Sequence, residues 1–150
     1  MKMLMDKIEA ILGKPKDIIL LVIRLTLGII FIQTGFGKLT HLSNTTEFFA
    51  NLRIPFPMIN AVMAGSTEFF GGILLVFGFL TRLISIPLTF VMIVAILTAQ
   101  LANINGFSDF IRLQEWDYIL FFVLLMSVGA GKYSLDASIR SKISPKSSVS

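Results

Sequence analysis

Residues 56–78 have the sequence FPMINAVMAGSTEFFGGILLVFG, a mostly apolar stretch with Glu68 near its centre. A helix needs about 20 such residues to span the hydrocarbon of a bilayer. A carboxylate at this depth costs several kcal/mol unless it is paired, protonated or hydrated. Small residues flank Glu68 on the same helix and would let a neighbouring helix approach closely: Ala61, Ala64, Gly65, Gly71 and Gly72. The chain is therefore expected to contain a buried polar centre around Glu68.

The composition around this stretch is that of a membrane protein. Of the 150 residues, 55% are hydrophobic and 15% are charged, whereas a soluble domain has about 25% charged residues. Apolar runs at 18–37, 58–79, 83–102 and 116–131 predict an all-α fold, an integral membrane four-helix transmembrane bundle. The first run has no small-residue cleavage site and is expected to remain as the first span.

Three segments are predicted along the chain. Residues 1–16 form an interfacial amphipathic helix, ended by the sequence GKPK at 13–16; residues 17–137 form the four-span domain; residues 138–150 form a disordered cytoplasmic tail. A second short amphipathic helix is expected over 45–53, in the first outer loop. Nine Lys and Arg residues lie near one side of the spans and three near the other, which predicts that both termini are cytoplasmic. The basic residues thus indicate orientation, and no nucleic-acid partner is expected.

Residue types limit the redox chemistry of this chain. It has no cysteine and a single histidine, His41. Thiol centres, iron–sulfur ligation and bis-histidine haem within one subunit are therefore excluded, and no metal site is predicted.

Arg24 is the second charge inside a predicted span, and it shares a helix face with glycines. With the first two spans antiparallel, Arg24 and Glu68 differ in depth by about 9 Å. The length of an Arg side chain predicts an Arg24–Glu68 pair; the alternative is that Arg24 reaches the cytoplasmic lipid phosphates.

Further polar residues gather in the outer half of the predicted bundle, on three spans. They are expected to line a cavity open to the outer face, with Glu68 at its floor; the alternative is a set of interhelical hydrogen bonds and a hydrated rim. The set is Gln33, Lys38, Gln100, Asn103 and Glu115, with His41 and Asp117 beside it.

Four ordered motifs resemble the DoxX family over residues 20–137. Residues 24–38 have the pattern RLxLGxxFxxxGxxK, FF at 48–49 precedes IPxP at 54–57, residues 68–82 have ExxGGxLLxxGxxTR, and residues 129–136 have GxGKYSLD. Ala130 replaces a frequent Pro, and Lys132 replaces a frequent Arg. The resemblance implies a four-span protein of the prokaryotic cytoplasmic membrane, related to small subunits of quinone-linked oxidases and of membrane redox complexes.

Three functions are consistent with these residues. The first is a redox-linked subunit that binds quinone or docks an oxidoreductase, with Glu68 as proton acceptor and Arg24, Gln100 or Lys38 as hydrogen-bond partners. The second is a small-molecule or proton-coupled transporter, which four spans would predict to be a homo-oligomer. The third is structural, with Glu68 and Arg24 fixing helix register for a partner protein. At most, the chain is a quinone-linked oxidoreductase subunit without a metal or thiol centre of its own.

Overall fold

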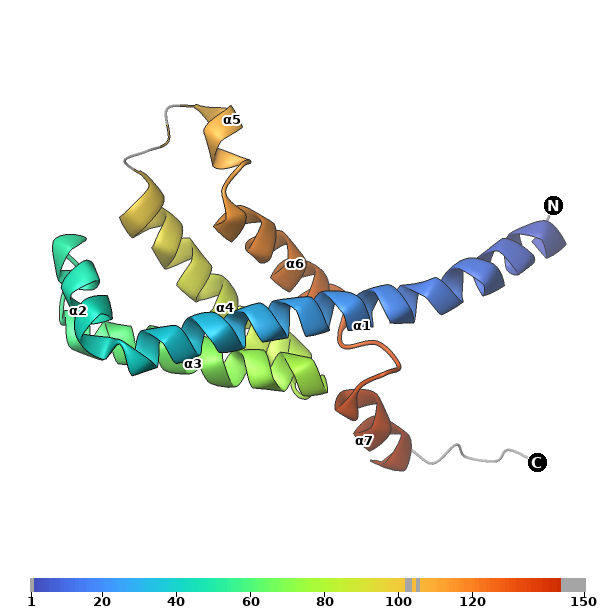
Figure 1. Ribbon diagram of the computed structural model, residues 1–150. Coiled ribbons are helices and arrows are strands. Elements are labelled where there is room, and N and C mark those ends of the chain that lie inside the picture. The colour runs from blue at the N-terminus through green and yellow to red at the C-terminus, as the bar shows by residue number, and fades with distance from the viewer. Residues whose placement is uncertain (1, 102–103, 105, 144–150) are drawn as a thin grey trace.

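The computed structural model describes residues 2–101, 104 and 106–143, and these residues form helices and their short connections. Four helices make the body of the protein (Figure 1): α1 (Lys2–Thr40), α3 (Pro57–Phe77), α4 (Thr81–Ala95) and α6 (Gln114–Val128). A π-helical turn, η1 (Ile96–Gln100), continues α4. α1 packs along α3, and α4 packs along α6. The predicted all-α fold is confirmed.

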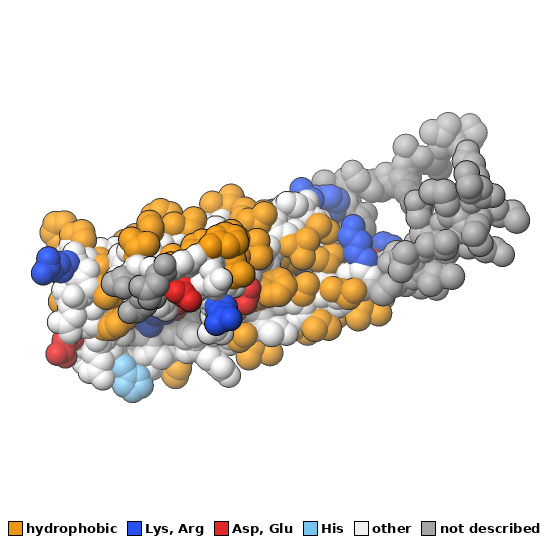
Figure 2. Space-filling view, turned by 90° about the horizontal axis from the view of Figure 1, so that it is seen from above, with side chains coloured by type: hydrophobic (Ala, Val, Ile, Leu, Met, Phe, Trp, Pro, Cys, Tyr) orange, Lys and Arg blue, Asp and Glu red, His pale blue; other side chains and the backbone are white. Residues whose placement is uncertain are grey.

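Three helical stretches are long and apolar enough to cross a membrane: Lys16–Thr40, Pro57–Phe77 and Thr81–Gln100. Their outward faces carry exposed large apolar side chains, such as Val22, Phe70 and Phe90. Hydrophobic side chains accordingly spread over the length of the bundle in the space-filling view (Figure 2). α6 has 15 residues and is therefore about 22 Å long, shorter than the about 30 Å of hydrocarbon in a typical bilayer.

Glycines set the spacing between α1 and α3. A Cβ atom on Gly35 would lie 2.7 Å from the carbonyl oxygen of Gly65, and one on Gly72 would lie 2.7 Å from the carbonyl oxygen of Gly28. Real side-chain atoms do not fit such gaps, so the two backbones touch because both helices carry glycine at the contact. This contact fixes the register of α1 against α3.

The core is aromatic and aliphatic, and it joins the two helix pairs. Phe31 of α1 packs edge-on against Tyr118 and Phe122 of α6, with ring centroids 5.2 and 5.1 Å apart. Leu75 and Leu88, from α3 and α4, are completely buried beside them. Arg24, Leu27 and Phe31 are all buried on one face of α1, as the sequence pattern predicts.

The outer-loop helix is present and starts earlier than predicted. α2 spans Leu42–Asn51, whereas the predicted helix spans residues 45–53. Its N-terminus has no side-chain capping hydrogen bond. Pro57 occupies the first turn of α3, where its missing N–H leaves no intrahelical bond unmade.

Both predicted terminal boundaries are wrong within the described residues. α1 continues without a break through 13–16, although an interior proline usually kinks or breaks a helix. The first helical stretch extends beyond the bundle at the N-terminal end (Figure 1). α7 (Leu135–Ile143) occupies the start of the predicted disordered tail; residues 144–150 lie outside the described residues, as do the side chains that would form the predicted amphipathic face of 1–12.

Two short helices complete the connections. α5 (Phe107–Phe110) precedes α6, and Phe110 packs on Trp116 with ring centroids 4.9 Å apart. The α3–α4 hairpin turns at Gly78, where φ is +64° and a side chain would be strained. There the carboxylate of Asp136, from α7, accepts hydrogen bonds from the backbone N–H groups of Leu80 and Thr81 at 2.8 and 3.1 Å.

Candidate functional site

Glu68 is the buried carboxylate that the sequence indicates, and it forms an ion pair with Lys38. The Lys38 Nζ atom lies 2.5 Å from Oε2 of Glu68. The side chain of Glu68 is 2% exposed, and that of Lys38 is 30% exposed. Pairing offsets part of the cost of burying the carboxylate, and the Lys38 side chain remains partly exposed.

The glycine contact between α1 and α3 places these two side chains together. Lys38 and Leu39 pack directly against Gly65, one turn before Glu68 on α3. A larger residue at 65 would separate the helix ends and draw Lys38 away from the carboxylate. The ion pair thus depends on small residues in both helices.

Beside the ion pair lies a cavity of about 610 Å³ between α1, α2, α3, α4 and α6. Most of its wall is apolar, and five aromatic side chains contribute to it: Phe31, Phe48, Phe49, Phe90 and Tyr118. The polar side chains of its wall are Thr34, Lys38, Asn60, Thr67, Glu68, Thr98, Gln100, Gln114 and Glu115, with the hydroxyl of Tyr118. An apolar cavity with a small number of placed polar groups is typical of a binding site for a small organic molecule.

A second set of polar side chains lies in the same cavity wall, on η1 and α6. Gln100 Nε2 donates to Oε1 of Glu115 at 3.1 Å, and Gln114 donates to the hydroxyl of Tyr118. Gln100 ends the π-helical turn, and such turns are frequent at functional sites because they change which side chains face inward. Besides the Lys38–Glu68 ion pair, the cavity wall therefore contains two side-chain hydrogen bonds, Gln100–Glu115 and Gln114–Tyr118.

The polar residues that the sequence indicates for this site do not all line the cavity. Lys38, Glu68, Gln100 and Glu115 share the cavity wall. Gln33 is exposed on α1 and is not part of the described wall, so its predicted place there is wrong. His41 and Asp117 are exposed, and Asn103 lies outside the described residues. The sequence interpretation did not include Thr34, Thr67 or Tyr118, although Thr34 and Tyr118 are each four residues from another wall residue of the same helix.

Arg24 does not meet Glu68, and the predicted Arg24–Glu68 pair is wrong. Its guanidinium donates to the carbonyl oxygens of Ala130 and Tyr133 at 2.9 and 2.8 Å. Arg24 is 1% exposed, so the alternative in which it reaches lipid phosphates is also wrong. Arg24 instead holds the loop between α6 and α7 against the opposite end of the bundle from Lys38.

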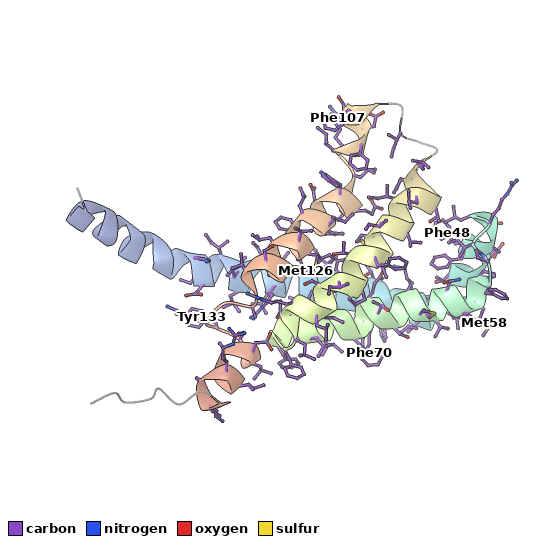
Figure 3. The ribbon with its side chains drawn as sticks, turned by 180° about the vertical axis from the view of Figure 1, so that it is seen from behind. Phe48, Met58, Phe70, Phe107, Met126 and Tyr133 are labelled. Atoms are coloured by element: carbon purple, nitrogen blue, oxygen red, sulfur yellow. The ribbon has the colours of Figure 1, made fainter. Side chains whose placement is uncertain are left out.

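No group of three or more His, Cys, Asp or Glu side chains able to hold a metal ion occurs among the described residues. The polar groups in the described cavity wall can donate and accept hydrogen bonds and stabilise charge, and a carboxylate placed there is suited to act as a general acid or base. Figure 3 shows the side chains around it, with Phe48 at the α2 end and Phe70 on α3 further toward the hairpin.

Comparison with known proteins gives a consistent result. The DoxX family model matches residues 19–101. The chain is 32% identical over 132 residues to "Inner membrane protein YqjF" of Escherichia coli strain K12, covering 86% of this chain and 98% of that protein. It is 31% identical over 109 residues to "Putative oxidoreductase CatD" of Bacillus subtilis strain 168, covering 73% of this chain and 76% of that protein.

A third relative, "Inner membrane protein YphA" of Escherichia coli strain K12, is 35% identical over 78 residues, covering 52% of this chain and 56% of that protein. No solved structure matches. The apolar helices and these relatives indicate a bacterial membrane protein. The chain belongs to the DoxX family.

Proposed function

We propose that this protein is a quinone-binding membrane subunit that works with a soluble or membrane oxidoreductase. The observation that supports this best is the Lys38–Glu68 ion pair in the wall of a mostly apolar cavity lined by aromatic side chains. A quinone ring is flat and apolar and carries one oxygen at each end, so it needs such a combination. The printed name of the relative CatD, which includes "oxidoreductase", is consistent with the proposal.

The ion pair has a defined part in this chemistry. Lys38 donates a hydrogen bond from Nζ to a quinone oxygen, and Glu68 accepts a proton from the hydroxyl of the reduced form. Quinol oxidation releases two protons and two electrons. The electrons pass to a redox centre of the partner oxidoreductase, because this chain has no cysteine and a single histidine. Glu115, held by Gln100, is the candidate acceptor for the second proton.

The proposal includes an orientation in the membrane. Charge distribution favours cytoplasmic termini, which puts Lys38, α2 and the cavity in the outer half of the bilayer. α6 is the fourth span in this arrangement. Its 15 residues pack along α4.

Quinone binding to purified protein in lipid nanodiscs tests the proposal. Trp116, the only tryptophan, follows the cavity residue Glu115 and reports binding through quenching of its fluorescence. We expect Glu68→Gln to raise the Kd by about tenfold or more, since a hydrogen bond to a charged group contributes about 1.5–3 kcal/mol. Glu47→Gln, an exposed residue of α2, is the matched control and should leave the Kd unchanged.

Two results would contradict the proposal. One is saturable binding with the same Kd in Glu68→Gln, Glu47→Gln and the unmodified protein, which would remove Glu68 from the site. The other is the absence of saturable quenching in the unmodified protein. Proteoliposome flux driven by a pH gradient would then favour the transport function instead.

A further inference from the structure

α3 and α4 separate along one side of the cavity (Figure 3). Near the hairpin the two helices are in close contact: a Cβ atom on Gly71 would lie 3.0 Å from Leu88. Further from the hairpin the helices diverge, α3 toward α2 and α4 toward η1 (Figures 1 and 3). Residues of both helices beyond the point of divergence line the cavity, among them Met63, Thr67, Val91 and Val94.

Each of these two helices contributes an exposed apolar residue to the cavity wall. Met63 on α3 and Phe90 on α4 line the cavity, yet they are 61% and 66% exposed. Both lie inside stretches that satisfy the length and hydropathy of a membrane span. At that depth an exposed face meets lipid rather than water, so the cavity wall borders the hydrocarbon of the bilayer at Met63 and Phe90, and the gap between α3 and α4 lies between these two residues.

From Met63 and Phe90 inward, the cavity wall becomes less exposed and more polar. Met63 and Phe90 are apolar, Thr67 and Val91 lie next along the two helices, and the Lys38–Glu68 pair lies deeper, with Glu68 1% exposed. A ligand that enters from lipid with its polar head first can place the head at the ion pair and leave an apolar tail at the gap. A water-soluble molecule gains nothing from such an entrance.

We propose that the gap between Met63 and Phe90 is a lateral portal, through which the isoprenoid tail of a membrane quinone extends from the cavity into the bilayer. The inference rests on the proposed function for the identity of the head group. It adds that the ligand is drawn from the lipid phase and that tail contacts at Met63 and Phe90 contribute to its affinity.

Single cysteines test the portal cleanly, because the natural chain has none. Phe90→Cys in nanodiscs is labelled with a lipid-soluble maleimide, with and without a tailed quinone whose ring is fully substituted and cannot add the thiol. With quinone at about ten times its Kd, about one site in ten remains free, so labelling should slow about tenfold. Phe70→Cys is the matched control: Phe70 is 59% exposed, on α3 and outside the described cavity wall, and its labelling should not change. Met63→Cys repeats the test from the other edge if Phe90→Cys does not fold.

Two further compounds separate the portal from the proposed quinone binding. One is a fully substituted quinone without a tail, and the other is an alcohol that carries the tail of the tailed quinone but no quinone ring. Protection of Phe90→Cys by the tailed quinone, with much weaker protection by the tailless one, is the expected result. If both quinones quench Trp116 with equal Kd and neither slows labelling, the portal is refuted while quinone binding stands. If the alcohol protects Phe90→Cys as well as the tailed quinone, and no quinone quenches Trp116, the portal stands and the quinone function is refuted. Labelling of Phe90→Cys that no tailed molecule slows overturns the portal in every case.

Discussion

Arg24 offers the sharpest test of how the bundle is held together at the end opposite the ion pair. Its guanidinium donates to the carbonyl oxygens of Ala130 and Tyr133, and it is 1% exposed. Arg24→Met fills a similar volume but removes both hydrogen bonds and leaves two carbonyl groups without that donor. Each bond to a charged donor contributes about 1.5–3 kcal/mol, so we expect the free energy of unfolding to fall by about 3 kcal/mol or more. This corresponds to about a hundredfold change in the unfolding equilibrium.

The measurement is reversible unfolding in detergent, followed by circular dichroism, with two comparison variants. Arg24→Lys keeps the charge but lacks the planar fork that reaches two carbonyl oxygens, so it should recover only part of the loss. Lys132→Met is the control: this cation belongs to the same loop, but its side chain is 86% exposed and lies 3.7 Å from Asp17. Such an exposed pair contributes little. Equal losses in Arg24→Met and Lys132→Met would refute the assigned role of Arg24.

Three further predictions concern helix contacts. Asp136→Ala removes the carboxylate that caps α4 and should cost about 0.5–2 kcal/mol, measured as faster hydrogen exchange of the first α4 amides; unchanged exchange would contradict it. Gly35→Ala should lower the thermal midpoint because its Cβ would overlap Gly65, whereas Gly37→Ala, with open space around it, should not lower it; equal shifts would argue against the close α1–α3 contact. Lys38→Met should destabilise the protein by leaving the buried Glu68 unpaired, and a second change, Glu68→Gln, should restore part of the loss in the same unfolding assay; full additivity would show that the two do not interact.

Much of this architecture follows from local sequence properties. The apolar runs are long enough that hydrophobicity alone indicates where helices cross a bilayer, and the apolar helices α1, α3, α4 and α6 each overlap a predicted run. The cost of an ionised group in lipid shows that Glu68 must face inward. Helix boundaries were less predictable near Pro15 and after Asp136, because an interior proline usually ends a helix and a polar segment gives no strong helix signal, whereas α1 and α7 continue through these positions.

The choice of partner for Glu68 was decided by tertiary structure. Sequence places two cations on the first span, Arg24 and Lys38, and span length alone cannot set the register between helices. Gly28 faces Gly72, and Gly35 faces Gly65 and Phe69. In this register Glu68 lies opposite positions 32–36, so Lys38 is about 3–9 Å away along the axis and Arg24 about 12–18 Å.

The sequence by itself thus determined that a buried carboxylate sits within a membrane bundle, because hydrophobic length and the cost of charge in lipid are properties of a single helix. Only the tertiary structure decided that Lys38 neutralises it, that Arg24 binds the loop before α7, and that α3 and α4 separate beside the cavity. These features depend on how closely two particular backbones approach, and that distance is set by side chains from both helices together.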